Sequence, residues 1–429
     1  MSNTAMMEFP GVTAPQGLPR LLGPGGADLP EHLRTHGPLP HQGALIEEIE
    51  AAGLTGRGGA GFPTAVKLAA VARQPGSKVA VGNGAESEPA SHKDKQLLWL
   101  APHLVLDGLQ LAAAAVGARR ACLYLHRHDQ LRRRLTDALA ERAAAGWDRV
   151  AVELVTAPPR FLAGEESALA SRIGGGLARP RFKRPPVYER GAGGAPTLVQ
   201  NVETLAHLAL IARHGAPWFR QVGTAAEPGS VIVTAHRADG VTVVREVPAG
   251  LPLGGLLGRA PAQAVLVGGY HGTWIPVQQA ARLPLANAAL RPLGAAVGAG
   301  VLAALPPDRC GLAETARVLR YLAAESAGQC GPCLNGLPRI ATAFAVLARP
   351  GADRRCLDDL ERWAGLVTGR GACHHPDGTV RLVRSALAAF SAETGRHLRG
   401  RCAADPAAAP FLPVPGSGYA APSARRDWR

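Results

Sequence analysis

A glycine-rich stretch, GLTGRGGAGFPTAVK, occupies Gly53–Lys67 and restricts the local fold more than any other segment of this 429-residue chain. From Gly56 onward it has the spacing G-x-G-x-x-G, which is typical of a Rossmann dinucleotide fingerprint. That fingerprint follows a strand, whereas the preceding residues 44–52, ALIEEIEAA, have the pattern of a helix. Two interpretations remain, a structural turn and a phosphate cradle. Clustered glycines let backbone N–H groups approach an anion, and a helix beginning at Pro63 would add a favourable dipole.

The cysteines and the apolar runs indicate the cellular environment. No run reaches the ~18 apolar residues of a membrane span, and no basic segment followed by an apolar one marks a secretory signal. Seven cysteines, an odd number without an export signal, argue against a disulfide framework. We therefore expect a cytoplasmic protein with no direct membrane span.

The net charge of +14 raises the question of nucleic-acid binding. Aromatic residues make up only 4% of the chain, too few to alternate with the cations as base-stacking platforms. We therefore predict no nucleic-acid partner. A solvated basic surface is the simpler interpretation, and docking to acidic partner proteins is the alternative.

The periodicity of the chain divides it into five parts. Residues 1–40 are rich in Pro and Gly and form an N-terminal extension. Residues 41–225 alternate between helix and strand patterns, with strands near 78–81 and 121–125, which predicts an α/β domain with a largely parallel sheet. Helices are expected at 102–116 and 130–144.

The pattern changes after residue 225. Within 226–306, VIVTAH and VTVVREV flank Asp239-Gly240, a hairpin signal, and a helix near 253–257 and a strand at 264–267 complete a small β-grasp-like domain. Residues 307–402 place Leu, Ile and Val at intervals of three and four, as in a helical bundle. Residues 403–429 contain five prolines and are expected to be a disordered tail.

Four further motifs follow the glycine-rich stretch at wide spacing: VGNGAESEPASHKDK, FLAGEESAL, PTLVQNVET and ESAGQCGPC. In this order they resemble the NADH-oxidising flavoprotein subunit of respiratory complex I, the F-subunit family of NADH-quinone oxidoreductase, and its relatives in NAD-linked hydrogenases and formate dehydrogenases. The likeness runs from about residue 40 to about residue 395. It implies an FMN-binding α/β domain, a β-grasp domain and a helical iron–sulfur domain.

The resemblance also implies the residues that contact FMN. They are Gly56, Arg57, Gly58, Gly59 and Lys67 in the glycine turn, Asn83 and Glu86 in the second motif, Gly164, Glu165 and Glu166 in the third, and Val199, Gln200, Asn201 and Thr204 in the fourth. Glu165 and Glu166 occupy the catalytic position where flavin and nicotinamide meet. For each Glu the alternative is an ordinary solvated surface carboxylate. The implied reaction is hydride transfer from nicotinamide C4 to flavin N5, followed by single electrons to a cluster.

The implied NADH contacts are less complete. Phe62 matches an aromatic residue that stacks on the nucleotide, and Glu88 and Lys183 match polar contacts. The chain departs from the family at Leu68, Ala70 and Pro186, where relatives carry aromatics, and at Ala85 and His92. Each missing stacking partner forfeits about 1 kcal/mol, so we expect weakened NADH binding.

The cluster motif departs further. Relatives supply C-x-x-C-x-x-C and a distant fourth Cys for a [4Fe–4S] cluster. Here Ala327 replaces the first Cys, and Cys330, Cys333 and Cys373 remain. The alternatives are a [3Fe–4S] cluster, a [4Fe–4S] cluster with another fourth ligand, and loss of the cluster with the thiols simply packed. The candidate fourth ligands are His374, Cys310 and Cys356, and no ligand role is expected for Cys122 or Cys402.

Three functions are compatible with these motifs. The first is an NADH dehydrogenase-type oxidoreductase that passes electrons from FMN through the cluster to a ferredoxin-like or membrane-bound acceptor subunit. Such a protein would be peripheral to a membrane through its partners. The second is a non-catalytic assembly or binding subunit, and the third is a flavoprotein with a donor other than NADH.

Overall fold

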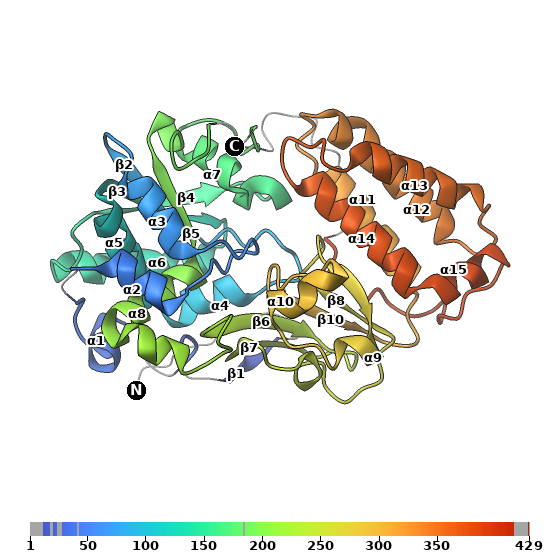
Figure 1. Ribbon diagram of the computed structural model, residues 1–429, viewed down its shortest axis with the longest axis horizontal. Helices are drawn as coiled ribbons and strands as arrows, with labels where there is room; N and C mark the ends of the chain where they lie inside the picture. The colour runs from blue at the N-terminus through green and yellow to red at the C-terminus, as the bar shows by residue number, and fades with distance from the viewer. Residues whose placement is uncertain are drawn as a thin grey trace.

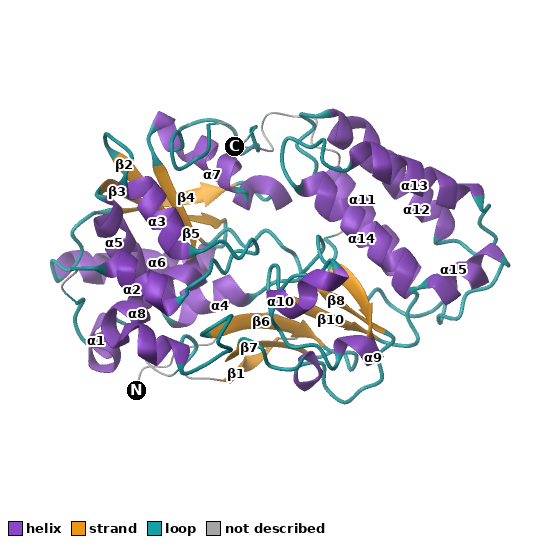
Figure 2. Ribbon diagram, viewed as in Figure 1, coloured by secondary structure: helices purple, strands orange, loops and turns teal. Residues whose placement is uncertain are grey.

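The computed structural model describes residues 12–17, 20–23, 28–40, 43–182, 185–415 and 428. Figure 1 shows three adjoining parts: an α/β part in blue and green, a second sheet in yellow-green, and a bundle of helices in orange and red. Figure 2 shows that the strands form two separate sheets and that the described third part consists of helices and loops without strands. The expected α/β architecture with a C-terminal helical region is confirmed.

The first sheet has four parallel strands in the order β4-β3-β2-β5. The strands are β2 (Lys78–Asn83), β3 (Ala118–His126), β4 (Val152–Ala157) and β5 (Thr197–Asn201). Around them lie α1 (Leu29–His36), α2 (Leu45–Ala52), α3 (Thr64–Ala72), α4 (Lys93–Leu100), α5 (Pro102–Val116), α6 (Asp129–Ala144), η1 (Phe161–Gly164), α7 (Glu166–Ile173) and α8 (Val202–Arg220). The glycine-rich stretch follows α2, as its sequence context predicts, and therefore does not follow a strand.

The second sheet has the order β1-β7-β6-β10-β8-β9. Its strands are β1 (Val12–Gly17), β6 (Ser230–His236), β7 (Thr242–Pro248), β8 (Ala264–Val267), β9 (Thr273–Pro276) and β10 (Val301–Leu305). The predicted hairpin is present, since β6 and β7 are antiparallel neighbours. The helix expected at 253–257 is only a 3₁₀ turn, η3 (Leu253–Gly255), and the short helices α9 (Val277–Ala280) and α10 (Asn287–Leu290) follow later. Part of the N-terminal extension, β1, pairs with β7 and so belongs to this sheet.

The helical part contains α11 (Gly311–Ala324), a π-helical turn at Pro332–Gly336, α12 (Leu337–Leu347), α13 (Arg355–Val367), α14 (His375–Ala389) and α15 (Ser391–Leu398). Within the described residues, no single helix is long and apolar enough to cross a membrane. Helices α4 and α5 pass such a test only together, and they meet at a bend of 97°.

The expected disordered tail is corrected over residues 403–415. Leu412 is buried, and the backbone N–H groups of Phe411 and Leu412 donate to the Glu314 carboxylate at 3.0 and 2.9 Å. Trp428 is also buried, against Leu162 and Ala327. Proline-rich composition alone did not reveal these anchors, because they depend on side chains far away in the sequence, a carboxylate in one case and apolar groups in the other.

Helices α5 and α8 approach each other at Gly108. A Cβ atom placed there would lie 1.9 Å from the Leu205 carbonyl oxygen, so only glycine permits this contact. The two helices cover one face of the first sheet and form much of its core.

We predict that Gly108→Ala destabilises the protein by roughly 1–3 kcal/mol or more, because the helices must separate. The matched control is Gly365→Ala on α13, where an added methyl meets nothing within 4 Å. This control should stabilise its helix by ~0.5–1 kcal/mol. Urea unfolding followed by circular dichroism measures both changes, and wild-type stability in Gly108→Ala would contradict the close approach.

Candidate functional site

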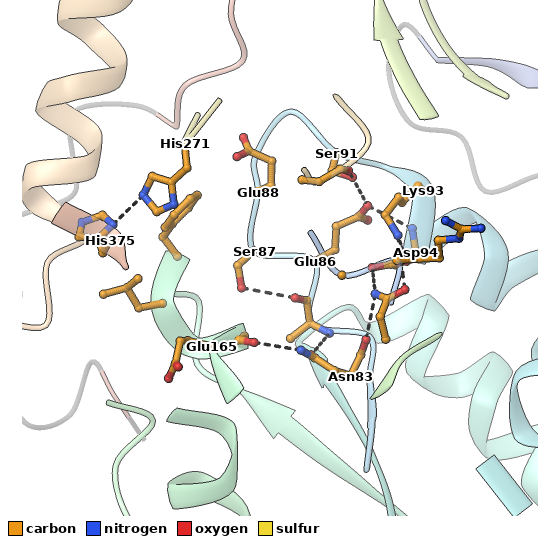
Figure 3. Close-up of a pocket in the computed structure, with 18 of the residues that line it drawn as sticks. Asn83, Glu86, Ser87, Glu88, Ser91, Lys93, Asp94, Glu165, His271 and His375 are labelled. Carbon is orange, nitrogen blue, oxygen red and sulfur yellow. Dashed lines mark hydrogen bonds and ion pairs between the residues drawn. The ribbon is translucent and has the colours of Figure 1, made fainter. Parts of the chain in front are cut away.

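A cavity of about 270 Å³ lies where β2 and β5 end and where the three parts of the molecule meet. The carboxyl ends of parallel strands are the usual ligand-binding edge of such sheets. Figure 3 shows the loop after β2 curving along the cavity, with His271 and His375 on the opposite side. The second sheet contributes His271 and Ala299 to the wall, and the helical part contributes residues 373–375.

The glycine turn forms one corner of this cavity. The Gly56 N–H donates to the Phe62 carbonyl at 2.8 Å, and the Arg57 N–H donates to Thr204 Oγ1 at 2.8 Å. A Cβ atom on Gly58 would lie 3.3 Å from Asn201 Cβ, tighter than an ordinary contact. The turn is therefore pressed against the start of α8, and a side chain at residue 58 would have to displace Asn201 or extend into the cavity.

Arg57 supplies a buried positive charge beside the turn. Its guanidinium donates to Thr55 Oγ1 at 3.3 Å and to the Pro228 carbonyl at 3.2 Å. The buried Nε has no hydrogen-bond partner among the described residues. Burial lowers the pKa of Arg57, although Glu203 and Glu227 oppose this shift. A buried cation with a spare donor beside clustered glycines fits a phosphate group.

Lys93 joins the wall to the first turn of α8. Its Nζ lies 2.7 Å from Asp94 Oδ1 and 2.8 Å from Glu203 Oε2. Burial disfavours the ammonium, but the two carboxylates outweigh burial and raise the pKa of Lys93. Asn201 caps α8 through the Glu203 N–H at 2.9 Å and donates to Asp94 Oδ2 at 2.7 Å. This network fixes the position of Asn201 at the cavity edge.

Glu86 and Glu88 come from the loop after β2. Burial would raise the pKa of Glu86, but Lys95 and a 2.5 Å hydrogen bond from Ser91 outweigh it and lower the pKa. Among the described residues, no cation contributes to the pKa of Glu88. Burial raises the pKa of Glu88 to about 7, even though the Tyr270 N–H donates to its carboxylate at 2.8 Å. The two carboxyl groups therefore differ in protonation near neutral pH.

The predicted catalytic pair is separated in the structure. Glu165 lines the cavity and caps α7, accepting the Ser167 N–H at 2.9 Å and the Ala168 N–H at 3.1 Å. Glu166 lies outside the cavity wall and forms an ion pair with Lys67 at 2.9 Å. Its partner Lys67 also donates to the Val199 carbonyl at 3.0 Å.

The predicted cofactor residues fall into three groups by their position relative to the cavity. Arg57, Gly58, Asn83, Glu86, Glu88, Gly164, Glu165 and Asn201 line the cavity. Gly56 and Gly59 line an adjoining hollow, and Phe62, Lys67, Val199, Gln200 and Thr204 lie outside the cavity wall. Gln200 is buried with its Nε2 unpartnered among the described residues, and Phe62 is half exposed. Lys183 lies outside the described residues.

Sequence reasoning missed the aromatic wall. Phe161 contacts His271 edge-to-face, with ring centroids 4.9 Å apart, and His271 Nε2 lies 2.9 Å from His375 Nδ1. His271 comes from the turn between β8 and β9, and no local signal in the sequence connects it to the flavin motifs. Ser91 and Asp94 lie inside the second motif, so the sequence could have indicated that they line the cavity.

The three predicted cluster cysteines meet beside this wall. Cys373 lines the cavity, and Cys333 is buried on the π-helical turn. Burial raises the pKa of the Cys333 thiol to about 12, and the neighbouring Cys330 and Cys373 thiols add to the rise. Three adjacent thiols fit an iron–sulfur cluster whose fourth iron lacks a Cys ligand.

The position of the missing cysteine, Ala327, is surrounded by apolar side chains. Ala327 lies against Leu162 and Trp428. Of the candidate ligands, Cys310 caps the opposite end of α11, whereas His374 is next to Cys373, with its side chain 80% exposed and Nδ1 3.6 Å from Asp377. The Ser326 hydroxyl contacts the Cys333 thiol.

Comparisons with known families agree with this geometry. Residues 49–210 match the Nuo51 FMN-binding domain, and residues 313–397 match the NADH-ubiquinone oxidoreductase-F iron-sulfur binding region. The chain is therefore similar, in two separate regions, to the F subunit of NADH-quinone oxidoreductase. An FMN-binding domain and an iron–sulfur binding region are thus present in one chain, as the motifs predict.

Curated relatives match along most of the chain. The second F-type NADH-quinone oxidoreductase subunit of Rhizobium meliloti is 28% identical over 83% of this chain and 89% of its own length. The corresponding F-type protein of Escherichia coli is 29% identical over 81% of this chain and 83% of its own length. The structure of an NAD⁺-reducing [NiFe]-hydrogenase in the H₂-reduced state superimposes with a TM-score of 0.75 at 30% identity. The match covers 85% of this chain but only 62% of that hydrogenase chain.

Glu88 gives a pH-dependent prediction for the flavin-free protein. The unfolded carboxyl titrates at ~4.3, so between there and about pH 7 the folded protein keeps a proton that the unfolded chain has lost. Folding stability should therefore fall as pH rises through this window. Glu88→Gln cannot titrate, so its stability relative to wild type should increase with pH. Urea unfolding across the window measures this difference, and parallel stability curves for the two proteins would contradict the raised pKa.

Proposed function

We propose that the chain oxidises NADH with FMN bound in the cavity and passes single electrons to a partner through a cluster at Cys330, Cys333 and Cys373. One observation carries the proposal. Cys373 belongs to the same cavity wall as Arg57 and Gly58, so the flavin and the cluster would be neighbours.

The residues divide the work of holding FMN. The glycine turn and Arg57 would bind the phosphate, and the edge formed by Asn83, Gly164 and Asn201 would support the ring. The Asn83 side chain donates to the Gly164 carbonyl at 2.9 Å, which holds two of these segments together. Bound FMN supplies the capacity to accept a hydride and release electrons one at a time. The protein contributes alignment and exclusion of water.

The partner is proposed to be a ferredoxin-like or membrane-bound acceptor subunit. The net charge of +14 favours docking to an acidic surface. In this proposal the chain works on the cytoplasmic side, peripheral to any membrane that carries its acceptor.

A donor other than NADH is the second candidate function. Leu68, at a position where the resemblance implies an aromatic, is fully buried in the core of the first domain. Phe62, by contrast, is half exposed and available for stacking. The smaller number of aromatic residues than the resemblance implies favours this alternative, although Leu68 itself lies in the core and outside the cavity wall. A non-catalytic role would leave the intact glycine turn without a purpose.

Anaerobic titration with NADH tests the proposal on the full-length protein after cluster reconstitution. NADH should bleach the flavin absorbance of wild type, whereas Gly58→Leu should retain no flavin because its side chain meets Asn201. Gly255→Leu is the matched control, since a Cβ atom there meets nothing within 4 Å. A spectrum that only dithionite bleaches would instead indicate another donor, and a wild-type protein without flavin would indicate an assembly subunit.

A further inference from the structure

A second group of metal-ligand side chains lies away from the cavity. The group consists of Cys310, Glu393, His397 and Cys402. Each residue offers one ligand atom, and these four atoms all lie within 4.8 Å of one another. Cys310 precedes α11, Glu393 and His397 are one turn apart on α15, and Cys402 follows α15. Helix α11 has 14 residues, so its length of ~21 Å separates this group from the cluster motif.

The distances inside this group suit a single metal ion. Zinc bonds of ~2.3 Å to sulfur and ~2.0–2.1 Å to nitrogen, at a tetrahedral angle, place the two ligand atoms about 3.6 Å apart. The distance from Cys310 Sγ to His397 Nε2 is 3.6 Å. His397 Nε2 lies 3.1 Å from Glu393 Oε1, so the carboxylate reaches the same point.

Neighbouring groups already orient these ligands. His397 Nδ1 lies 3.0 Å from the Leu347 carbonyl, so Nδ1 carries the proton and the Nε2 lone pair faces the group. Arg396 holds Glu393 Oε2 at 2.7 Å through its Nε, which leaves Oε1 directed at His397. Glu393 Oε1 also accepts the Ala403 N–H at 3.1 Å, which fixes the segment that carries Cys402.

The donor chemistry and charge select the ion. Two thiolates and an imidazole prefer zinc over magnesium or calcium, which favour oxygen ligands. Two thiolates and one carboxylate carry three negative charges, which one Zn²⁺ and the Arg396 guanidinium balance. Glu393 and His397 are buried, whereas Cys402 is exposed and leaves a path for the ion to enter.

We propose that Cys310, Glu393, His397 and Cys402 bind one structural Zn²⁺ ion that fastens the segment after α15 to the start of α11. This site is separate from the iron–sulfur cluster and does not depend on NADH or FMN binding. It assigns a ligand role to Cys402, for which the sequence offered none.

Metal analysis of the full-length chain tests this proposal. The protein is purified under reducing conditions, loaded with ZnCl₂, dialysed against a weak chelator and analysed for zinc and iron. Wild type and Cys122→Ser should retain one zinc per chain, because Cys122 lies in the first sheet beside Glu153. Cys402→Ser and His397→Gln should bind zinc at least ~10–100-fold more weakly, with iron content unchanged. Circular dichroism verifies that the variants are folded, and Cys402 lies outside every helix.

Two outcomes would overturn the zinc site. One is wild-type zinc content no higher than that of Cys402→Ser. The other is a Cys310–Cys402 disulfide, found by mass spectrometry of the alkylated protein, that persists under the reducing conditions of purification. Co²⁺ added to the zinc-free wild type gives a further positive readout, because tetrahedral thiolate coordination produces strong visible and charge-transfer bands that Cys402→Ser should lack.

Discussion

The buried carboxylate of Glu325, at the end of α11, joins the flavin domain to the helical domain. It forms a 3.1 Å ion pair with Arg160 and accepts the Phe161 N–H at 2.7 Å. Both side chains are almost inaccessible, and removing one partner of such a pair costs roughly 3–5 kcal/mol. The contact fixes η1, whose Phe161 and Leu162 line the cavity while Leu162 packs on Ala327. The cavity and the cluster cysteines are therefore built as one assembly.

Charge balance explains how an acidic cavity could accept a phosphate. Lys93 compensates Asp94 and Glu203, and burial raises the pKa of Asp94 to about 6 and that of Glu88 to about 7. Arg57 keeps a spare donor at the glycine turn. Lys93 thus offsets part of the negative charge of the wall, and Arg57 adds a buried positive charge beside the glycine turn.

Local signals predicted local structure well. Pro102–Val116 forms the helix that its apolar pattern indicates, and Asp239-Gly240 forms the turn between β6 and β7. The motifs also identified the cavity edge, because Asn83 and Asn201 end neighbouring strands. Contacts between distant segments were not predictable. Nothing in the local pattern showed that Lys67 would pair with Glu166, or that a turn of the second sheet would bring His271 to the wall.

The most direct test of the central claim is the amount of FMN, iron and acid-labile sulfide per chain in the anaerobically purified full-length protein. Cys373 lines the cavity proposed for FMN. We therefore predict one FMN per chain, together with about three to four irons and a similar amount of sulfide. A chain that binds iron and sulfide but no flavin, or flavin with no sulfide, would contradict the account.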